Sequence, residues 1–323
     1  MSKNYTSKRT TLFVWFIAIL LVTVIMVIII KPYFFHKQPF KLFGYVAYNT
    51  TVNEGYAYTT ANKGFYVSRI LDDGSIKDNY LFKTNDTCFG IDVIEGDLFV
   101  GYESGNLIQY DITDPENISE ISSIYLNETV LGIAAKDNVI YVSTTGGSIF
   151  AITLIDLTII DTYSLGNEYI RDVQVYNNYL LYASIDSGVG ILDITDPENL
   201  TFVKKISNTS ASFDINIYDN KLFVSRHQYG LFIFEISDNN GFTLIENIDI
   251  SGEVYSSAFD GTYLIIGDLQ EGIEKWQYDE STNGFEYLDT FKRTVPHHLY
   301  IYDNYIVTAD QDRGLFIIPL VEE

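Results

Sequence analysis

The sequence predicts an all-β fold, a seven-bladed β-propeller preceded by one N-terminal transmembrane helix. Three observations predict it: evenly spaced glycines, strand-like sequence between them, and one long uncharged apolar segment near the N-terminus. A period of about 40–45 residues with four short strands is typical of propeller blades. Successive glycines are 41 or 42 residues apart, and they are Gly64, Gly105, Gly147, Gly188, Gly230, Gly272 and Gly314.

The apolar segment covers residues 12–30 and contains no charge. As a helix rising about 1.5 Å per residue, it spans roughly 28 Å, close to the hydrocarbon thickness of a bilayer. A cleaved signal peptide is the alternative. A cleavage site with small residues should then follow the apolar segment, but Lys31, Pro32 and Tyr33 follow it instead. We therefore expect a basic cytoplasmic tail over 1–11, an anchor helix over 12–30, a juxtamembrane linker over 31–39 and the propeller over 40–323.

Charge is distributed unevenly between these parts. Residues 42–323 contain all 43 Asp and Glu but only 14 of the 20 Lys and Arg, which gives a formal charge of −29. Such a domain repels phosphate, which argues against nucleic acid and anionic headgroups as partners of the propeller. The basic residues that flank the apolar segment orient it only weakly. We expect a single-pass protein of the cell membrane, in contact with the bilayer through residues 12–30, with a cytoplasmic N-terminus and an extracytoplasmic propeller.

Glycosylation sequons support an extracytoplasmic propeller. One sequon, at Asn4, precedes the apolar segment, and six follow it, at Asn49, Asn85, Asn117, Asn127, Asn199 and Asn208. Cys88 is the only cysteine, so no intrachain disulfide can form. Stability must then come from burial of the core, and a ring of this size can bury a large one.

Turn residues divide the propeller into strands. Asp-Asn and Asn-Asn pairs at 137–138, 177–178, 219–220 and 303–304 tolerate the positive φ of two-residue hairpins. First strands are expected near 47–52, 89–94, 131–136, 171–176, 213–218, 255–259 and 297–302. The last blade has only three strands of its own, ending with 314–320. Residues 40–44 are expected to supply its fourth strand and thereby hide an open edge.

Two blades share the heptapeptide Asp-Ile-Thr-Asp-Pro-Glu-Asn, at 111–117 and 193–199. Asp followed by Pro after a strand initiates a turn, so we interpret this motif as structural. Together with Arg171-Asp172-Val173 and the segment 177–183, the segment 190–197 resembles the LVIVD repeat. The resemblance implies a surface propeller of an archaeal or bacterial type over residues 40–323. It implies no catalytic residue.

No catalytic or cofactor motif is present. The nucleophile elbow, the P-loop, the dinucleotide fingerprint and the His-Glu-x-x-His zinc motif are all missing. His297 and His298 are adjacent on a strand, so their side chains are expected on opposite faces. Residues 310–314 begin like a calcium loop, but apolar strand sequence follows. We therefore expect no metal and no cofactor, and we expect that the protein is not an enzyme, although a site built from scattered residues stays open.

The candidate binding residues come from aligning the repeats on their first turn. First strands line the central channel of a propeller, so residues at their beginnings should form a ring at one mouth of that channel. The aligned position is occupied by Tyr48, Gly90, Gly132, Asp172, Asp214, Tyr255 and His298, and the preceding position contributes Arg171 and His297. The two glycines are expected to leave room for a ligand. The alternative is that these residues only cap strand ends.

Charged residues at the ends of second strands are expected on the same face as this ring. They include Asp186, Arg226, His227, Asp268, Asp310 and Arg313. Such a mixed polar face suits a peptide or a glycan better than an apolar small molecule. The favoured function is a membrane-anchored recognition or scaffold module that binds an extracellular or envelope protein or glycan. The alternative is a hydrolase or lyase with its site at the channel mouth. The linker should hold the opposite face towards the bilayer, with the ring turned outward.

Overall fold

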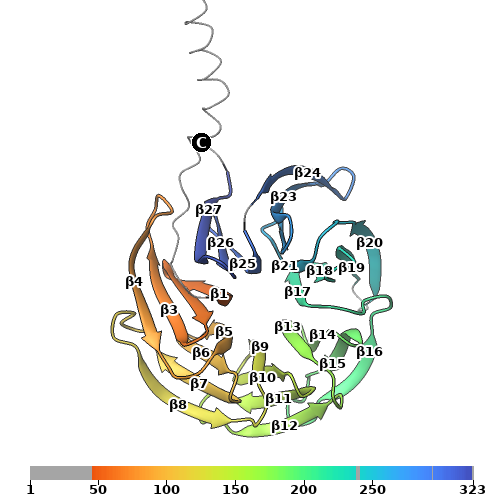
Figure 1. The fold of residues 1–323 in the computed structure, drawn as a ribbon. Helices are drawn as coiled ribbons and strands as arrows, with labels where there is room; N and C mark the ends of the chain where they lie inside the picture. Colours follow the sequence, from red (N-terminus) through yellow and green to blue (C-terminus); the bar gives the residue numbers. More distant parts are fainter. Residues whose placement is uncertain (1–45, 238–240, 293, 322–323) are drawn as a thin grey trace, which may run out of the picture. The chain divides into compact units, whose positions relative to one another are not determined.

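The computed structural model describes residues 46–237, 241–292 and 294–321, and all of them belong to one compact unit. The predicted tail, anchor and linker, and the predicted closing strand 40–44, lie outside the described residues. The described part contains strands and turns, and none of its segments is a helix long and apolar enough to cross a membrane. Seven antiparallel sheets stand around a central axis like the blades of a propeller (Figure 1).

Each blade is a meander in which consecutive strands pair from the axis outward. Blade 1 contains β1 (Ala47–Asn53), β2 (Tyr56–Ala61), β3 (Gly64–Ile70) and β4 (Ile76–Lys83). Blade 2 contains β5 (Cys88–Ile94), β6 (Asp97–Tyr102), β7 (Asn106–Asp111) and β8 (Ser119–Tyr125). Blade 3 contains β9 (Val130–Lys136), β10 (Val139–Thr144), β11 (Ser148–Thr153) and β12 (Ile159–Ser164). Blade 4 contains β13 (Ile170–Tyr176), β14 (Tyr179–Ser184), β15 (Gly188–Asp193) and β16 (Thr201–Lys205).

The remaining blades repeat this order. Blade 5 contains β17 (Asp214–Tyr218), β18 (Lys221–Ser225), β19 (Leu231–Ile236) and β20 (Phe242–Ile248). Blade 6 contains β21 (Val254–Phe259), β22 (Tyr263–Asp268), β23 (Gly272–Asp279) and β24 (Gly284–Phe291). Blade 7 contains β25 (Pro296–Tyr302), β26 (Tyr305–Asp310) and β27 (Gly314–Pro319) within the described residues. First strands of neighbouring blades contact one another all the way round, including β25 with β1, so the ring is closed. The seven-bladed, all-β prediction is confirmed.

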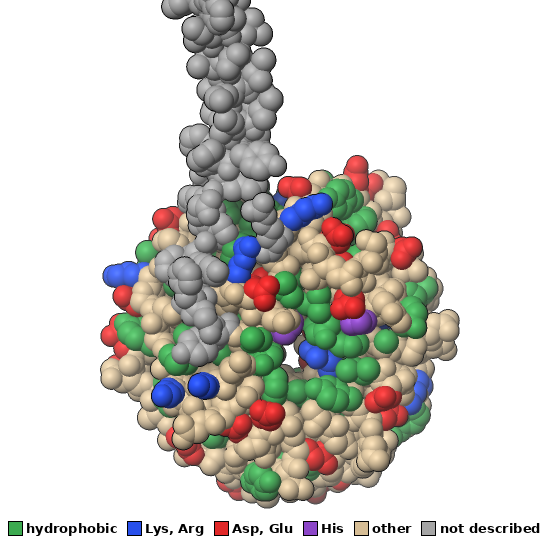
Figure 2. Space-filling model, in the orientation of Figure 1, with side chains coloured by type: hydrophobic (Ala, Val, Ile, Leu, Met, Phe, Trp, Pro, Cys, Tyr) green, Lys and Arg blue, Asp and Glu red, His purple; other side chains and the backbone are tan. Residues whose placement is uncertain are grey.

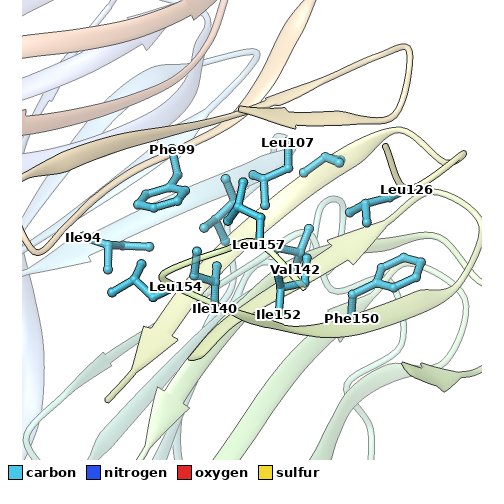
Figure 3. Packing of buried hydrophobic residues seen from close by; sticks show 12 residues of the cluster. Ile94, Phe99, Leu107, Leu126, Ile140, Val142, Phe150, Ile152, Leu154 and Leu157 are labelled. Atoms are coloured by element: carbon cyan, nitrogen blue, oxygen red, sulfur yellow. The ribbon is translucent and has the colours of Figure 1, made fainter. Parts of the chain in front are cut away.

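The core lies between the blades, where the apolar side chains of facing sheets interdigitate. Between blades 2 and 3, Phe99 and Leu107 face Ile140 and Val142, and all four side chains are fully buried (Figure 3). Ile and Leu are the commonest of these buried residues, followed by Val, and the β-branched and aromatic side chains among them suit a sheet that is covered on both faces. Burying each such side chain contributes about 1.5–3 kcal/mol, so these interfaces supply the stability that no disulfide provides.

The periodic glycines have a shared backbone role. All seven have positive φ, from 77° at Gly230 to 126° at Gly64, and each lies where a third strand begins. At Gly64 a Cβ atom would lie 2.0 Å from the carbonyl oxygen of Phe82, so no other residue fits. The repeat that identified the fold is therefore a steric requirement of the hairpin between second and third strands.

Candidate functional site

A one-residue bulge occurs at the start of six of the seven first strands. In β13, for example, Ile170 pairs with Ser184 and Asp172 pairs with Ala183, which leaves Arg171 as the extra residue. The same irregularity is present in β1, β5, β9, β21 and β25. A bulge re-aims side chains at the end of a strand, and this one presents an extra residue from each of these six blades at one mouth of the channel.

Registering the strands on the bulge gives two rings instead of the single ring predicted from the sequence. We call the ring nearest the mouth the collar; it consists of Tyr48, Phe89, Leu131, Arg171, Phe213, Tyr255 and His297. We call the next ring into the channel the inner ring; it consists of Asn49, Gly90, Gly132, Asp172, Asp214, Ser256 and His298.

The predicted alignment thus mixed residues of the two rings. Tyr48 and Tyr255 belong to the collar with Arg171 and His297, whereas Asp172, Asp214 and His298 belong to the inner ring. In blade 6 the cause is a longer turn, because Phe259 pairs with Leu264 there, whereas the other six first hairpins have two-residue turns. In blade 1 the residue in register with Asp172 is Asn49.

Ring contacts join most of the collar into a continuous surface. The imidazole of His297 stacks on Tyr48 on one side and on Tyr255 on the other, with centroid distances of 5.8 and 5.5 Å. Phe89 extends this series beyond Tyr48 at 4.7 Å, and Phe213 extends it beyond Tyr255 at 4.8 Å. All of these side chains are only half-buried. The collar therefore presents aromatic faces to whatever enters the mouth.

Arg171 continues this surface in blade 4. Its guanidinium carbon lies 5.2 Å from the ring centroid of Phe213 and 5.1 Å from that of Tyr255. Among the described residues the guanidinium makes no hydrogen bond and no ion pair. Its charge lowers the pKa of His297, after the larger effect of burial, so the imidazole stays neutral at pH 7. Figure 2 shows histidine and basic side chains among hydrophobic ones around the opening at the centre of this face.

The inner ring joins neighbouring blades through hydrogen bonds from one blade to the next. A carboxylate oxygen of Asp172 accepts the N–H of Ile215 at 3.2 Å, and one of Asp214 accepts the N–H of Ser257 at 3.1 Å. The hydroxyl of Ser256 likewise accepts the N–H of Leu299 at 3.2 Å. The inner-ring side chain of one blade thus binds the backbone of the following blade. Asp172 and Asp214 therefore have a structural role whatever binds above them.

The two inner-ring glycines leave no gap, contrary to the prediction. A Cβ atom at Gly90 would lie 2.5 Å from the carbonyl oxygen of Leu131. One at Gly132 would lie 2.8 Å from the Cα atom of Asp172. The next blade fills the space that a side chain would take, so these glycines permit close packing of blades.

Carboxyl groups inside the channel titrate abnormally. Burial raises the pKa of Asp92 to about 7, and the charge of Asp172 adds to the shift. Burial also raises the pKa of Asp172 to about 6, against the opposing effect of its two backbone hydrogen bonds and of Arg171. The pKa of Asp214 is raised by burial and by Asp172. Burial lowers the pKa of His298 to about 4, so this imidazole is neutral at pH 7.

Most of the charged residues at the ends of second strands have partners on this face. Asp268 accepts N–H groups of Glu253, Gln270 and Glu271, and Asp310 accepts those of Val295 and Asp312. Asp186 accepts the N–H of Tyr169, and Arg226 donates to the carbonyl of Ser210. His227 pairs with Glu253 at 3.3 Å, and Arg313 stacks on Phe316. These groups build loops at the mouth.

Five of the six sequons that follow the apolar segment are accessible. Asn85, Asn117, Asn127, Asn199 and Asn208 are exposed, whereas Asn49 lies in the inner ring with its side-chain oxygen bonded to the N–H of Thr50. Within the described ranges, no group of three His, Cys, Asp or Glu side chains is placed to hold a metal ion.

Phe89 and Phe213 are site residues that the sequence prediction missed. Phe213 directly precedes Asp214, as Arg171 precedes Asp172 and His297 precedes His298. An alignment that allowed one extra residue before the inner ring would have placed Phe89 and Phe213 at the same position as Arg171 and His297.

Comparisons with known proteins support the fold. No protein-family model matches the sequence, and no curated protein is significantly similar to it. A catalytically inactive variant of virginiamycin B lyase from Staphylococcus aureus, solved with quinupristin, is 18% identical with a TM-score of 0.70, covering 88% of this chain and 99% of that one. A chain of the mitotic checkpoint complex is 13% identical with a TM-score of 0.74, covering 89% and 92%. The WD40 repeats of RRP9 are 10% identical with a TM-score of 0.71, covering 88% and 97%. At such identities the likeness shows the propeller fold alone.

Proposed function

We propose that the protein is a membrane-anchored recognition module whose propeller binds an extracytoplasmic protein or glycan through the collar. The observation that carries the proposal is the half-exposed aromatic surface built from Tyr48, His297, Tyr255 and Phe213. Aromatic side chains combine large contact area with low conformational entropy, so they are enriched where proteins bind partners. The similar fold of a chain in the mitotic checkpoint complex is compatible with a role in protein binding.

The membrane setting is part of the same proposal. The uncharged segment 12–30 supports an anchor, and the resemblance to LVIVD repeats supports a surface protein. The five exposed sequons support an extracytoplasmic propeller.

The test is capture of partners by the full-length chain in lipid nanodiscs from an envelope extract, with cross-linking and mass spectrometry. Three baits are compared: the wild type, a Tyr48→Ala/Tyr255→Ala variant, and a matched Tyr80→Ala/Tyr287→Ala variant. Tyr80 and Tyr287 are exposed on the outer strands β4 and β24, so their loss removes aromatic surface away from the mouth. We expect the collar variant alone to lose the captured partner. Equal capture by all three baits would place the binding surface elsewhere.

A hydrolase or lyase with its site at the mouth is the second candidate. The observation that favours it is the group of channel carboxyls with raised pKa values, because such groups gather at active sites. The similar fold of virginiamycin B lyase is compatible with it. However, the backbone hydrogen bonds of Asp172 and Asp214 give both residues a structural role. Turnover of quinupristin or of an envelope glycan that is lost in Asp92→Asn but kept in Glu286→Gln would favour this candidate.

A further inference from the structure

We infer that Arg171 is the anchoring residue of the mouth and that it binds a carboxylate group of a partner peptide. The inference rests on the proposed function and names the chemistry of the ligand that the collar would take. It depends on where the guanidinium lies, on which of its hydrogen-bonding groups are free, and on what surrounds it.

The guanidinium of Arg171 is held in place by aromatic rings and forms no ion pair with a carboxylate of the described residues. It packs against the rings of Phe213 and Tyr255, and no carboxylate of the described residues lies within 4 Å of its nitrogen atoms. A guanidinium has five N–H donors in a planar fork that matches a carboxylate. Contact with the two rings holds the guanidinium in place, and its N–H groups have no hydrogen-bond partner in the part of the chain that the structure describes. Less entropy is therefore lost when a carboxylate binds.

The arrangement of charge along the channel favours an anion over a cation at this point. Arg171 precedes Asp172 in β13, so it lies nearer to the mouth, and a ligand entering from that side meets the guanidinium first. The carboxyl groups of Asp172 and Asp214 lie deeper, where they accept backbone N–H groups of the next blade. A cation would have to pass Arg171 to reach them.

The surroundings favour a peptide over an acidic sugar. A sugar presents several hydroxyl groups that need hydrogen bonds, but two polar groups of the collar are already engaged. The hydroxyl of Tyr48 bonds to Asn62, and the Nε2 atom of His297 lies 3.1 Å from the side-chain oxygen of Gln311. Apolar rings of the collar flank the guanidinium. One carboxylate next to apolar or aromatic side chains matches this surface, and the acidic propeller disfavours a ligand with many carboxylates.

The test uses the full-length chain in nanodiscs and four defined probes, with affinities measured by saturation-transfer NMR titration. Two probes are acetylated, amidated tetrapeptides that differ only in Glu or Gln: Gly-Tyr-Glu-Gly and Gly-Tyr-Gln-Gly. The third is acetylated Gly-Tyr-Gly-Gly with a free C-terminal carboxylate, and the fourth is the methyl glycoside of glucuronic acid. The first and third probes distinguish a side-chain carboxylate from a chain terminus.

We expect at least one carboxylate peptide to bind the wild type about tenfold more tightly than the Gln peptide, as a charge-assisted bidentate pair implies. Arg171→Gln should remove the difference, and Arg171→Lys should restore only part of it because the planar fork is lost. The matched control is Arg313→Gln, which removes a stacked arginine outside the collar and should leave the difference unchanged. Circular dichroism of each variant checks that the propeller is folded.

Three results would overturn the inference: equal affinity of the Glu, free-carboxylate and Gln peptides for the wild type, an equal effect of Arg171→Gln and Arg313→Gln, or tighter binding of the glucuronoside than of either carboxylate peptide. The proposed function is tested separately. If Arg171→Gln captures the envelope partner as well as the wild type does, while Tyr48→Ala/Tyr255→Ala does not, the collar remains the binding surface and the carboxylate assignment is wrong.

Discussion

The imidazole of His297 stacks on the phenol ring of Tyr255, with centroids 5.5 Å apart and planes inclined by 19°. This contact joins blade 7 to blade 6 at the channel mouth, and the contact of His297 with Tyr48 joins blade 7 to blade 1. Blade 7 has three strands in the described part of the chain, so these contacts reach both neighbours of the blade where the ring closes. The collar is therefore a structural link between blades as well as the candidate binding surface.

His297→Ala is expected to lower the free energy of unfolding by about 1 kcal/mol, because it removes two aromatic stacking contacts at a half-exposed site. His297→Phe keeps a planar ring and should lie close to the wild type. Urea unfolding of the full chain in nanodiscs, followed by tryptophan fluorescence, measures both variants, because Trp276 lies in the propeller. Equal destabilisation by Ala and Phe would show that stacking is not what the imidazole contributes.

Asp214→Ala is expected to destabilise the propeller by about 1–3 kcal/mol, because it leaves the buried N–H of Ser257 without an acceptor. Asp214→Asn retains an oxygen at that position and serves as the matched control. The same unfolding experiment compares them. If Ala and Asn variants were equally stable, the bond between blades would have no energetic role.

Asp92→Asn is expected to stabilise the protein at pH 8 and to have less effect as the pH falls towards 4. The pKa of Asp92 is about 7 in the folded protein and near 3.8 when unfolded, so the folded state binds the proton more tightly. The contribution of the Asp92 carboxyl to the free energy of unfolding is therefore fully present below the unfolded pKa, and it is lost as the pH rises through the folded pKa of about 7. Asp92 is only half-buried, so partial hydration of its carboxyl reduces the effect, and we expect a gain on the order of 2 kcal/mol at pH 8.

The measurement for Asp92→Asn is the free energy of unfolding at several pH values, relative to the wild type. Glu286→Gln, which neutralises an exposed carboxylate on β24, is the control and should show no such trend. A gain in stability that did not vary with pH would mean that ionisation of the Asp92 carboxyl does not destabilise the folded state.

The fold could be predicted from the sequence because each blade repeats the same steric solution. Positive φ at Gly64 and its six counterparts demands glycine, and the turn residues Asp137, Asn177, Asp219 and Asp303 all have positive φ as expected. These are local requirements of the backbone, so they leave a regular trace in the sequence. The first strands accordingly begin within a residue or so of the predicted positions.

The site could be predicted only in part, because its register depends on pairing between strands. The bulge at Arg171 does not require a particular residue type. Its position in the seven blades is occupied by Tyr, Phe, Leu, Arg or His. Five of the seven residues predicted for the ring therefore lie together in the inner ring. Tyr48 and Tyr255 lie one residue away from it, in the collar. The inner-ring hydrogen bonds to the next blade were not foreseeable, since they join residues 43 positions apart.

Single-cysteine labelling should place the N-terminus and the propeller on opposite sides of the membrane. Cys88 is buried and gives little background, so Ser2→Cys reports the N-terminus and Ser281→Cys reports the propeller. Ser281 is exposed in the turn between β23 and β24. A membrane-impermeant maleimide is expected to label Ser281→Cys in intact cells, and Ser2→Cys only after lysis. Labelling of Ser2→Cys in intact cells, or a mature N-terminus near Lys31, would contradict the anchored topology.

Replacing residues 40–44 by a Gly-Ser sequence of equal length should destabilise the propeller far more than the same replacement at 33–37. In the described structure β27 pairs only with β26, whereas the third strand of every other blade pairs on both sides. A fourth strand from residues 40–44 would add several backbone hydrogen bonds of about 0.5–1.5 kcal/mol each, so a loss on the order of 3 kcal/mol is expected. It would also cover an edge that otherwise invites association between chains. Unfolding of both variants in nanodiscs, followed by tryptophan fluorescence, measures the difference. Equal stability of the two variants would mean that the ring is held closed by the contacts of β25 with β1 and by the collar rather than by a shared blade.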